Sequence, residues 1–131
     1  MLVSHPALLP SGFSDRLPAA AAHNINTEYK LLQHFARHGY DYVKPPLLEF
    51  EESLLSGTGQ SMARRTFRLM DPATQRMLAL RADMTIQIAR IAATRLIDAP
   101  RPLRLSYAGD VVHAQARDPK PDRQFTQTGL S

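Results

Sequence analysis

The sequence contains no cysteine among its 131 residues. This absence excludes a disulfide framework, a zinc site built on thiolates and a cysteine nucleophile. The sequence also has no run of the ~18 apolar residues that a membrane-spanning helix requires. The opening segment Met1–Pro10 lacks the basic stretch and following apolar run of a secretory signal. We therefore expect a cytoplasmic protein with no membrane segment.

Basic residues are only modestly in excess of acidic ones. Sixteen basic residues, of which thirteen are arginine, stand against twelve acidic residues, and the net charge is +4. An excess of this size would suit an anionic partner, either nucleic acid or a phosphate-bearing metabolite. No run of five like charges occurs, so an ordinary solvated surface is the better interpretation. Charge alone does not select a function.

Patterns that would hold a metal ion or a phosphate group are also missing. Of the five histidines, only His34 and His38 have the i, i+4 spacing of a helical ligand pair, and no third ligand accompanies them. The glycines of Gly57-Thr58-Gly59 lack the third glycine and the following helix of a phosphate-binding loop. We predict no metal site and no cofactor.

Composition and periodicity indicate one globular domain over residues 1–131, since 44% of the residues are hydrophobic and 21% are charged. A helix is expected over Ala19–His38, and Gly39 ends it as a left-handed residue. One face of this helix is apolar at spacings of three and four: Ala22, Ile25, Tyr29, Leu32 and Phe35.

The next segments are less regular. Tyr40–Val43 should be extended, because it is aromatic and β-branched and precedes two prolines. Leu47–Leu55 could be a strand or a short helix. Ser56–Arg65 contains Gly57 and Gly59 and is expected to be a flexible loop.

Two antiparallel hairpins are predicted, one from Thr66–Met70 with Met77–Arg81 and one from Leu103–Val112 with Arg123–Thr128. Between them, Asp83 or Thr85 can cap a helix. Its expected apolar face comprises Ile86, Ala89, Ala93 and Leu96. Hairpins with intervening helices indicate an α+β fold, an antiparallel sheet flanked by helices.

Residues 38–48, from His38 to Leu48, resemble motif 1 of class II aminoacyl-tRNA synthetases. That motif is a helix end, a strand and a proline at the dimer interface. The resemblance implies a homodimer in which Pro46 lies at the interface. A helix cap followed by an edge strand is the simpler alternative.

Residues 80–85, followed by Ala89 and Arg90, resemble the stretch with which histidyl-tRNA synthetases bind the α-amino group of histidine. The resemblance implies that Asp83 and Thr85 bind histidine, and a carboxylate with a hydroxyl suits an ammonium group. The alternative is a pair that caps the helix without a ligand. The sequence of residues 80–85, Leu-Arg-Ala-Asp-Met-Thr, is more typical of a regulatory paralogue than of the synthetases themselves.

Residues 104–131 resemble class II motif 2, two antiparallel strands joined by a long loop. In synthetases an arginine at the end of the first strand clamps the ATP α-phosphate and the amino-acid carboxylate. His113 occupies this position, Gln115 replaces the acidic residue two positions on, and Ser131 replaces a glutamate. Arg123 matches an arginine near the nucleotide, and Gln127 matches a glutamine that lines the amino-acid pocket; either could instead be an ordinary strand residue.

The three motifs together resemble the regulatory subunits of ATP phosphoribosyltransferase, catalytically silent relatives of histidyl-tRNA synthetase. The resemblance implies a hetero-oligomer with the short catalytic subunit, activation of that enzyme, histidine as an effector and no tRNA substrate. Adenylation should be badly impaired. Proteins of this family continue past motif 2, so we expect residues 1–131 to be the amino-terminal part of a truncated class II core. The alternatives are a fragment of a genuine histidyl-tRNA synthetase and a dimerisation module without a ligand.

Overall fold

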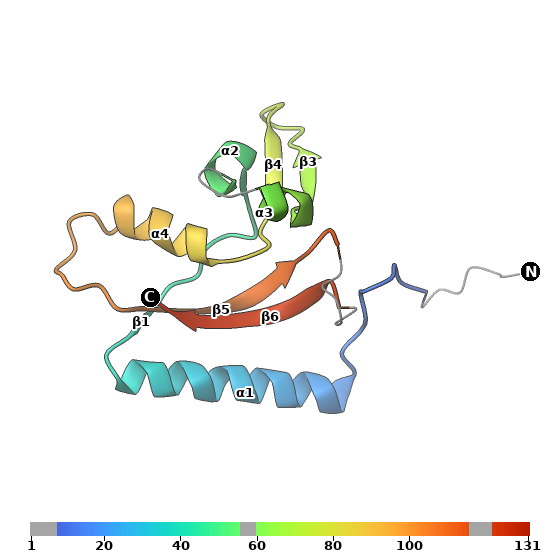
Figure 1. Cartoon of the computed structure of the whole chain (residues 1–131). Coiled ribbons are helices and arrows are strands. Elements are labelled where there is room, and N and C mark those ends of the chain that lie inside the picture. Colours follow the sequence, from blue (N-terminus) through green and yellow to red (C-terminus); the bar gives the residue numbers. More distant parts are fainter. Residues whose placement is uncertain (1–7, 56–59, 116–121) are drawn as a thin grey trace, which may run out of the picture.

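The structure, a computed structural model, describes residues 8–55, 60–115 and 122–131. Pairs of strands are interspersed with helices along the chain, and the strands form two three-stranded sheets with helices against them (Figure 1). The predicted α+β class is confirmed. In order, the elements are α1 (Pro18–Arg37), β1 (Asp41–Tyr42), β2 (Leu48–Phe50), α2 (Glu51–Leu54), α3 (Gln60–Arg65), β3 (Arg68–Met70), β4 (Met77–Leu80), α4 (Thr85–Ala93), β5 (Leu105–Val112) and β6 (Gln124–Leu130).

The larger sheet has the strand order β1-β5-β6. Strands β5 and β6 form the second predicted hairpin, and their antiparallel register runs from Ser106 opposite Leu130 to Val112 opposite Gln124. Strand β1 instead lies parallel to β5, so the expectation of purely antiparallel pairing was wrong here. The parallel arrangement arises because the chain passes through the smaller sheet and α4 before it returns to the neighbour of β1.

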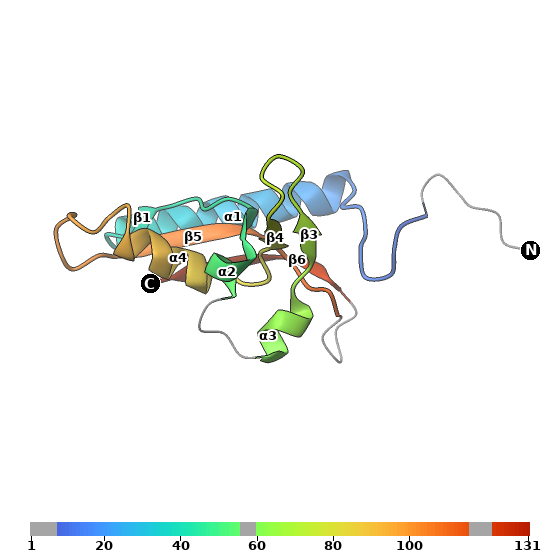
Figure 2. The same ribbon diagram turned by 90° about the horizontal axis from the view of Figure 1, so that it is seen from above.

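Helix α4 covers one face of the larger sheet, and α1 runs along the opposite face (Figures 1 and 2). The core lies between α4 and β5. Each of its central residues is at most 5% exposed: Met84, Ile88, Leu105, Tyr107 and Val111. Packing of α4 on the hairpin therefore places the start of that helix over β5 and β6.

The buried side of α4 is not the predicted one. Gln87 and Ile88 are buried, whereas Ala89 and Ala93 are exposed. The predicted Ile86 and Leu96 are only half-buried. The spacing of apolar residues predicted the wrong buried face for α4, because a polar residue, Gln87, lies on the buried side and forms its hydrogen bonds there.

Helix α1 ends at Gly39 as predicted, but its predicted apolar face is mostly solvent-exposed. Ile25 and Tyr29 are 66% and 62% exposed, while Leu32 and Phe35 are half-buried. An open groove of about 270 Å³ separates the amino-terminal half of α1 from β6. The helix therefore packs on the sheet mainly near its carboxyl end.

The smaller sheet has the order β2-β4-β3, and β3 with β4 forms the first predicted hairpin. Its turn is stabilised by the Asp71 carboxylate, which accepts hydrogen bonds from the Ala73 amide (2.9 Å) and the Thr74 hydroxyl (2.8 Å). Residues 47–55 were predicted to form either a strand or a short helix, and they contain both: strand β2 is followed by helix α2.

The prediction of a loop over residues 56–65 was wrong for Gln60–Arg65, which form helix α3. The two glycines that suggested a loop precede this helix and lie in 56–59, outside the described residues. Good helix formers follow them, among them Met62, Ala63 and two arginines, and these favour the helix.

Gly39 provides a test of the α1 terminus. Its backbone is left-handed, with φ of 84°, and an added Cβ would meet only Arg104 Nη1, at 3.9 Å. We expect Gly39→Ala to lower the free energy of unfolding by about 1–2 kcal/mol, because an L side chain strains this conformation. Gly39→Asn should cost less, since asparagine tolerates positive φ. Urea unfolding measures both, and equal losses would show that backbone conformation is not the cause.

Candidate functional site

Three residues that the motifs single out come together where α4 begins above β6. The Asp83 Oδ1 atom accepts hydrogen bonds from the Thr85 amide and hydroxyl, both at 2.9 Å, and from Gln127 Nε2 at 3.0 Å. The Gln127 Oε1 atom accepts a hydrogen bond from the Met84 amide at 2.9 Å. One glutamine side chain thus joins β6 to the first turn of α4. The predicted capping role of Asp83 or Thr85 was wrong, because the N-cap of α4 is Met84 and no side chain caps it; the Asp83–Thr85 bond closes a local turn just before the helix.

These hydrogen bonds favour the charged form of Asp83. Partial burial acts to raise the pKa of its carboxyl group, but the hydrogen bonds from Thr85, Gln127 and the Met84 backbone outweigh burial. The pKa of Asp83 consequently lies below its ordinary value. At neutral pH the site therefore holds a negative charge suited to a cationic group.

His113 lies directly after β5 and is buried, with 4% of its surface exposed. Its Nε2 atom is 2.9 Å from the Ala82 carbonyl oxygen, so Nε2 carries the proton that it donates there. The ring also contacts Phe125 edge-on, with centroids 5.0 Å apart. This imidazole serves as a structural link between β5 and the segment that precedes Asp83.

The other altered positions lie at the ends of the hairpin. Gln115 is exposed at the start of the β5–β6 connection. Ser131 is exposed and exchanges two backbone hydrogen bonds with Leu105, at 2.7 and 2.8 Å. Neither position provides a carboxylate to the Asp83 site.

Arg123 contacts the amino-terminal arm. Its Nη1 donates to the Ser11 carbonyl at 2.9 Å, and its Nε donates to the His113 carbonyl at 3.3 Å. The guanidinium also lies against the rings of Phe13 and Phe67, with its Cζ atom 4.9 and 5.3 Å from their centroids. Arg123 thus fastens the arm to the hairpin, and its role near a nucleotide stays a prediction.

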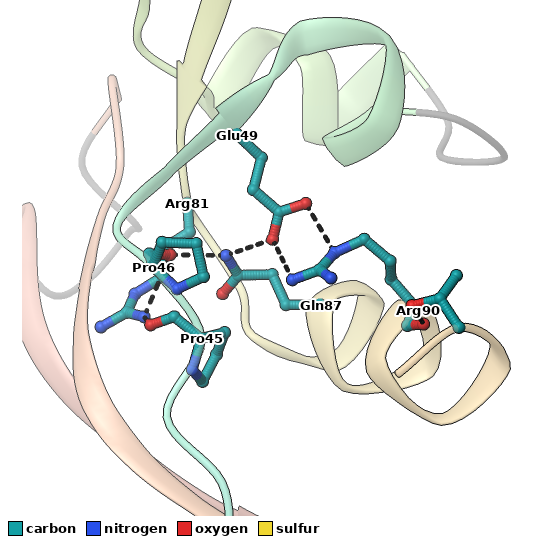
Figure 3. Close-up of polar contacts among 7 residues, drawn as sticks. Pro45, Pro46, Glu49, Arg81, Gln87 and Arg90 are labelled. Atoms are coloured by element: carbon teal, nitrogen blue, oxygen red, sulfur yellow. Dashed lines mark hydrogen bonds and ion pairs between the residues drawn. The ribbon is translucent and has the colours of Figure 1, made fainter. Parts of the chain in front are cut away.

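The residues after β1 form a proline loop, Pro45–Leu47, which is bound by side chains to which the motif analysis gave no role. Gln87 Nε2 donates to the Pro46 carbonyl at 2.6 Å and to Glu49 Oε2 at 2.8 Å (Figure 3). Arg90 forms a two-pronged ion pair with Glu49, at 2.9 and 3.0 Å. The loop is therefore tied to α4, while Pro46 itself is exposed, as an interface residue needs to be.

Arg81 is the second residue that binds this loop. It is 5% exposed, and its Nη1 donates to the Pro45 carbonyl at 3.0 Å while its Nε donates to the Asp110 carbonyl of β5 at 2.8 Å. Burial lowers the pKa of Arg81, opposed by the charge of Asp110, but a guanidinium remains protonated in proteins. The available signal was a single arginine directly after an apolar strand.

Within the described parts of the chain, no group of three or more histidine, aspartate or glutamate side chains is placed to hold a metal ion. No helix of those parts is both long and apolar enough to cross a bilayer.

The sequence profile of histidyl-tRNA synthetase matches residues 12–130 and so covers nearly all of the motifs and the site described above. The chain belongs to the histidyl-tRNA synthetase family. Its fold is the α+β fold of class II synthetases: a structure titled as an ATP phosphoribosyltransferase regulatory subunit/histidyl-tRNA synthetase from Bacillus halodurans superposes with a TM-score of 0.78 at 30% identity. That superposition covers 99% of this chain and 33% of the other.

Within the family, curated relatives named ATP phosphoribosyltransferase regulatory subunit are considerably more similar. The protein of Rhodospirillum centenum is 56% identical over 124 residues, which cover 95% of this chain and 32% of that protein. The protein of Paramagnetospirillum magneticum is 57% identical over 124 residues, with 95% and 33% covered. The chain thus spans about a third of the length of these relatives.

The Asp83 site predicts a specific acid sensitivity. Because the folded pKa lies below the ordinary value of 3.8, the charged carboxylate stabilises the fold above that value, and the contribution is lost as the pH falls through the folded pKa. We expect Asp83→Asn to lower the unfolding free energy at about pH 7 and to have a smaller effect at about pH 2. Denaturant unfolding at both pH values measures this difference. An equal effect at both would contradict a role for the charge.

Proposed function

We propose that this protein is the regulatory subunit of an ATP phosphoribosyltransferase and has no aminoacylation activity. Curated relatives with that name are 56% and 57% identical to the chain. The observation that carries the proposal is His113, a buried imidazole at the position where the resemblance implies the phosphate-clamping arginine.

Adenylation needs a permanent charge that binds two oxygen atoms at once, and arginine meets that need with a planar fork. The His113 ring has one nitrogen facing the Ala82 carbonyl and is packed against Phe125. It therefore has no fork to offer to an α-phosphate. Binding without chemistry is the activity that this site favours.

The ligand that we propose is histidine, held by Asp83, Thr85 and Gln127. A charged Asp83 carboxylate is the acceptor that an α-ammonium group prefers, and Gln127 orients it from β6. A ligand that binds one state of a protein more tightly shifts the balance between states, and a partner can respond to that shift. In this way a pocket that no longer activates histidine can still sense it.

The partner in this proposal is the short catalytic subunit, which the protein activates in a hetero-oligomer at the first step of histidine biosynthesis in the cytoplasm. Residues 1–131 would form the amino-terminal part of its class II core. Motif 1 over 38–48 would supply a homodimer interface around the exposed Pro46. Motif 2 would extend over 104–131, with Arg123 near any bound nucleotide.

Histidine binding is the first test of the proposal. Titration calorimetry of the full-length protein should detect histidine, and Asp83→Asn should weaken the affinity by about tenfold or more, because the ammonium loses its charged acceptor. Asp71→Asn is the matched control, since it removes a hydrogen-bonded carboxylate from the distant β3–β4 turn and should leave the affinity unchanged. Absence of heat at millimolar histidine would refute the pocket.

A genuine histidyl-tRNA synthetase is the second candidate, since the matching family profile carries that name, although the curated relatives support it less well than the regulatory role. The two candidates differ in one measurable reaction, histidine-dependent exchange of pyrophosphate into ATP. We expect no exchange by the intact protein, and we expect it to co-purify with the short catalytic subunit and raise the rate of that enzyme. Robust exchange would identify a synthetase. Failure to co-purify, without exchange, would favour a dimerisation module.

A further inference from the structure

The buried guanidinium of Arg81 has unusual partners. Its hydrogen bonds to the residues that the structure describes go to main-chain carbonyl oxygens: Pro45 at 3.0 Å, Pro46 at 3.4 Å and Asp110 at 2.8 Å. Removing a charge from water is expensive, and neutral acceptors compensate for it only in part. An apolar side chain would fill the space without that cost. What arginine adds is a rigid planar group whose Nη1 atom reaches the proline loop (Figure 3) while its Nε atom reaches Asp110 of β5.

The Arg81 guanidinium lies directly against the backbone of β5 at Gly109. A Cβ atom at that position would lie 2.5 Å from Arg81 Nη2 and 3.3 Å from its Cζ atom. A carbon and a nitrogen atom that are not bonded do not approach to 2.5 Å without one being displaced, so the guanidinium can lie against β5 only because Gly109 has no side chain. The backbone at Gly109 needs no positive φ, and close approach is the reason for glycine here.

The segment from Arg81 to Met84 is attached to the hairpin residue by residue. The Arg81 carbonyl accepts a hydrogen bond from the Val112 amide at 3.1 Å, and the Ala82 carbonyl faces His113 at 2.9 Å. The Met84 amide then donates to Gln127 at 2.9 Å. Asp83 lies within this row, so its position relative to Gln127 depends on how the segment is held at its Arg81 end.

We propose that Arg81, seated on Gly109, is a positioning residue that holds Asp83 in register with Gln127 and so sets the geometry of the histidine pocket. The histidine part of this statement rests on the proposed function. Arg81 touches no ligand in this role. It acts through the backbone of residues 81–84, which it fixes against β5 and the proline loop.

Two variants test this role in the full-length protein. Arg81→Lys keeps the charge but loses the fork, and Gly109→Ala displaces the guanidinium from its seat. Leu105→Ala is the control, because it removes a buried side chain at the far end of β5 and destabilises the same sheet. We expect both variants to weaken histidine binding by about tenfold, and the control to change it by less than about twofold at a comparable loss of thermal stability.

Hydrogen exchange gives a readout that does not depend on histidine. In Arg81→Lys and Gly109→Ala, the Met84 and Thr85 amides should exchange faster relative to the β5 amides, because the bonds to Gln127 and Asp83 loosen locally. In Leu105→Ala all slow amides should speed up together. If the unaltered protein binds no histidine, the proposed function fails while exchange still decides the role of Arg81. Uniform acceleration in all three variants would overturn the positioning role.

Discussion

The antiparallel pairing of β5 with β6 determines where every residue of the candidate site lies. Its register places Gln127 opposite Gly109, so the strand that carries the glutamine and the strand that seats Arg81 have a fixed relation. Strand β5 also presents Tyr107 and Val111 to α4, and burial of that core packs the start of α4 onto the hairpin. A shift of one residue would turn Gln127 to the opposite face of the sheet.

Local chemistry made much of the fold predictable from sequence. Gly39 ends α1 because a residue without a side chain adopts the left-handed conformation freely, and Asp71 forms the β3–β4 turn through its own carboxylate. Both hairpins follow from alternation and turn residues. The convergence of Asp83 and Thr85 with Gln127 came from resemblance to a known family and not from periodicity, since 44 residues separate Asp83 from Gln127.

Contacts between distant segments limited the rest. Arg81 binds carbonyl groups that are 29 and 36 residues away in the sequence, and Gln87 binds one that is 41 residues away. A local sequence pattern cannot predict which main-chain carbonyl will accept such a bond. Gln87 also shows why the α4 face was misplaced, because a buried amide that satisfies its donors looks like a surface residue in a sequence. The parallel neighbour β1 was missed because hairpin signals report only pairing between consecutive strands.

The position of β6 at the outside of its sheet has a practical consequence. Among the described elements β6 pairs only with β5, so its second edge carries a row of backbone donors and acceptors turned outward. Such an edge is a template for another extended chain, and covering or charging it is how proteins avoid intermolecular association. Leu130, 42% exposed, and the uncharged residues between Phe125 and Gly129 offer little deterrent. A preparation limited to these 131 residues would therefore be inclined to self-associate through strand addition.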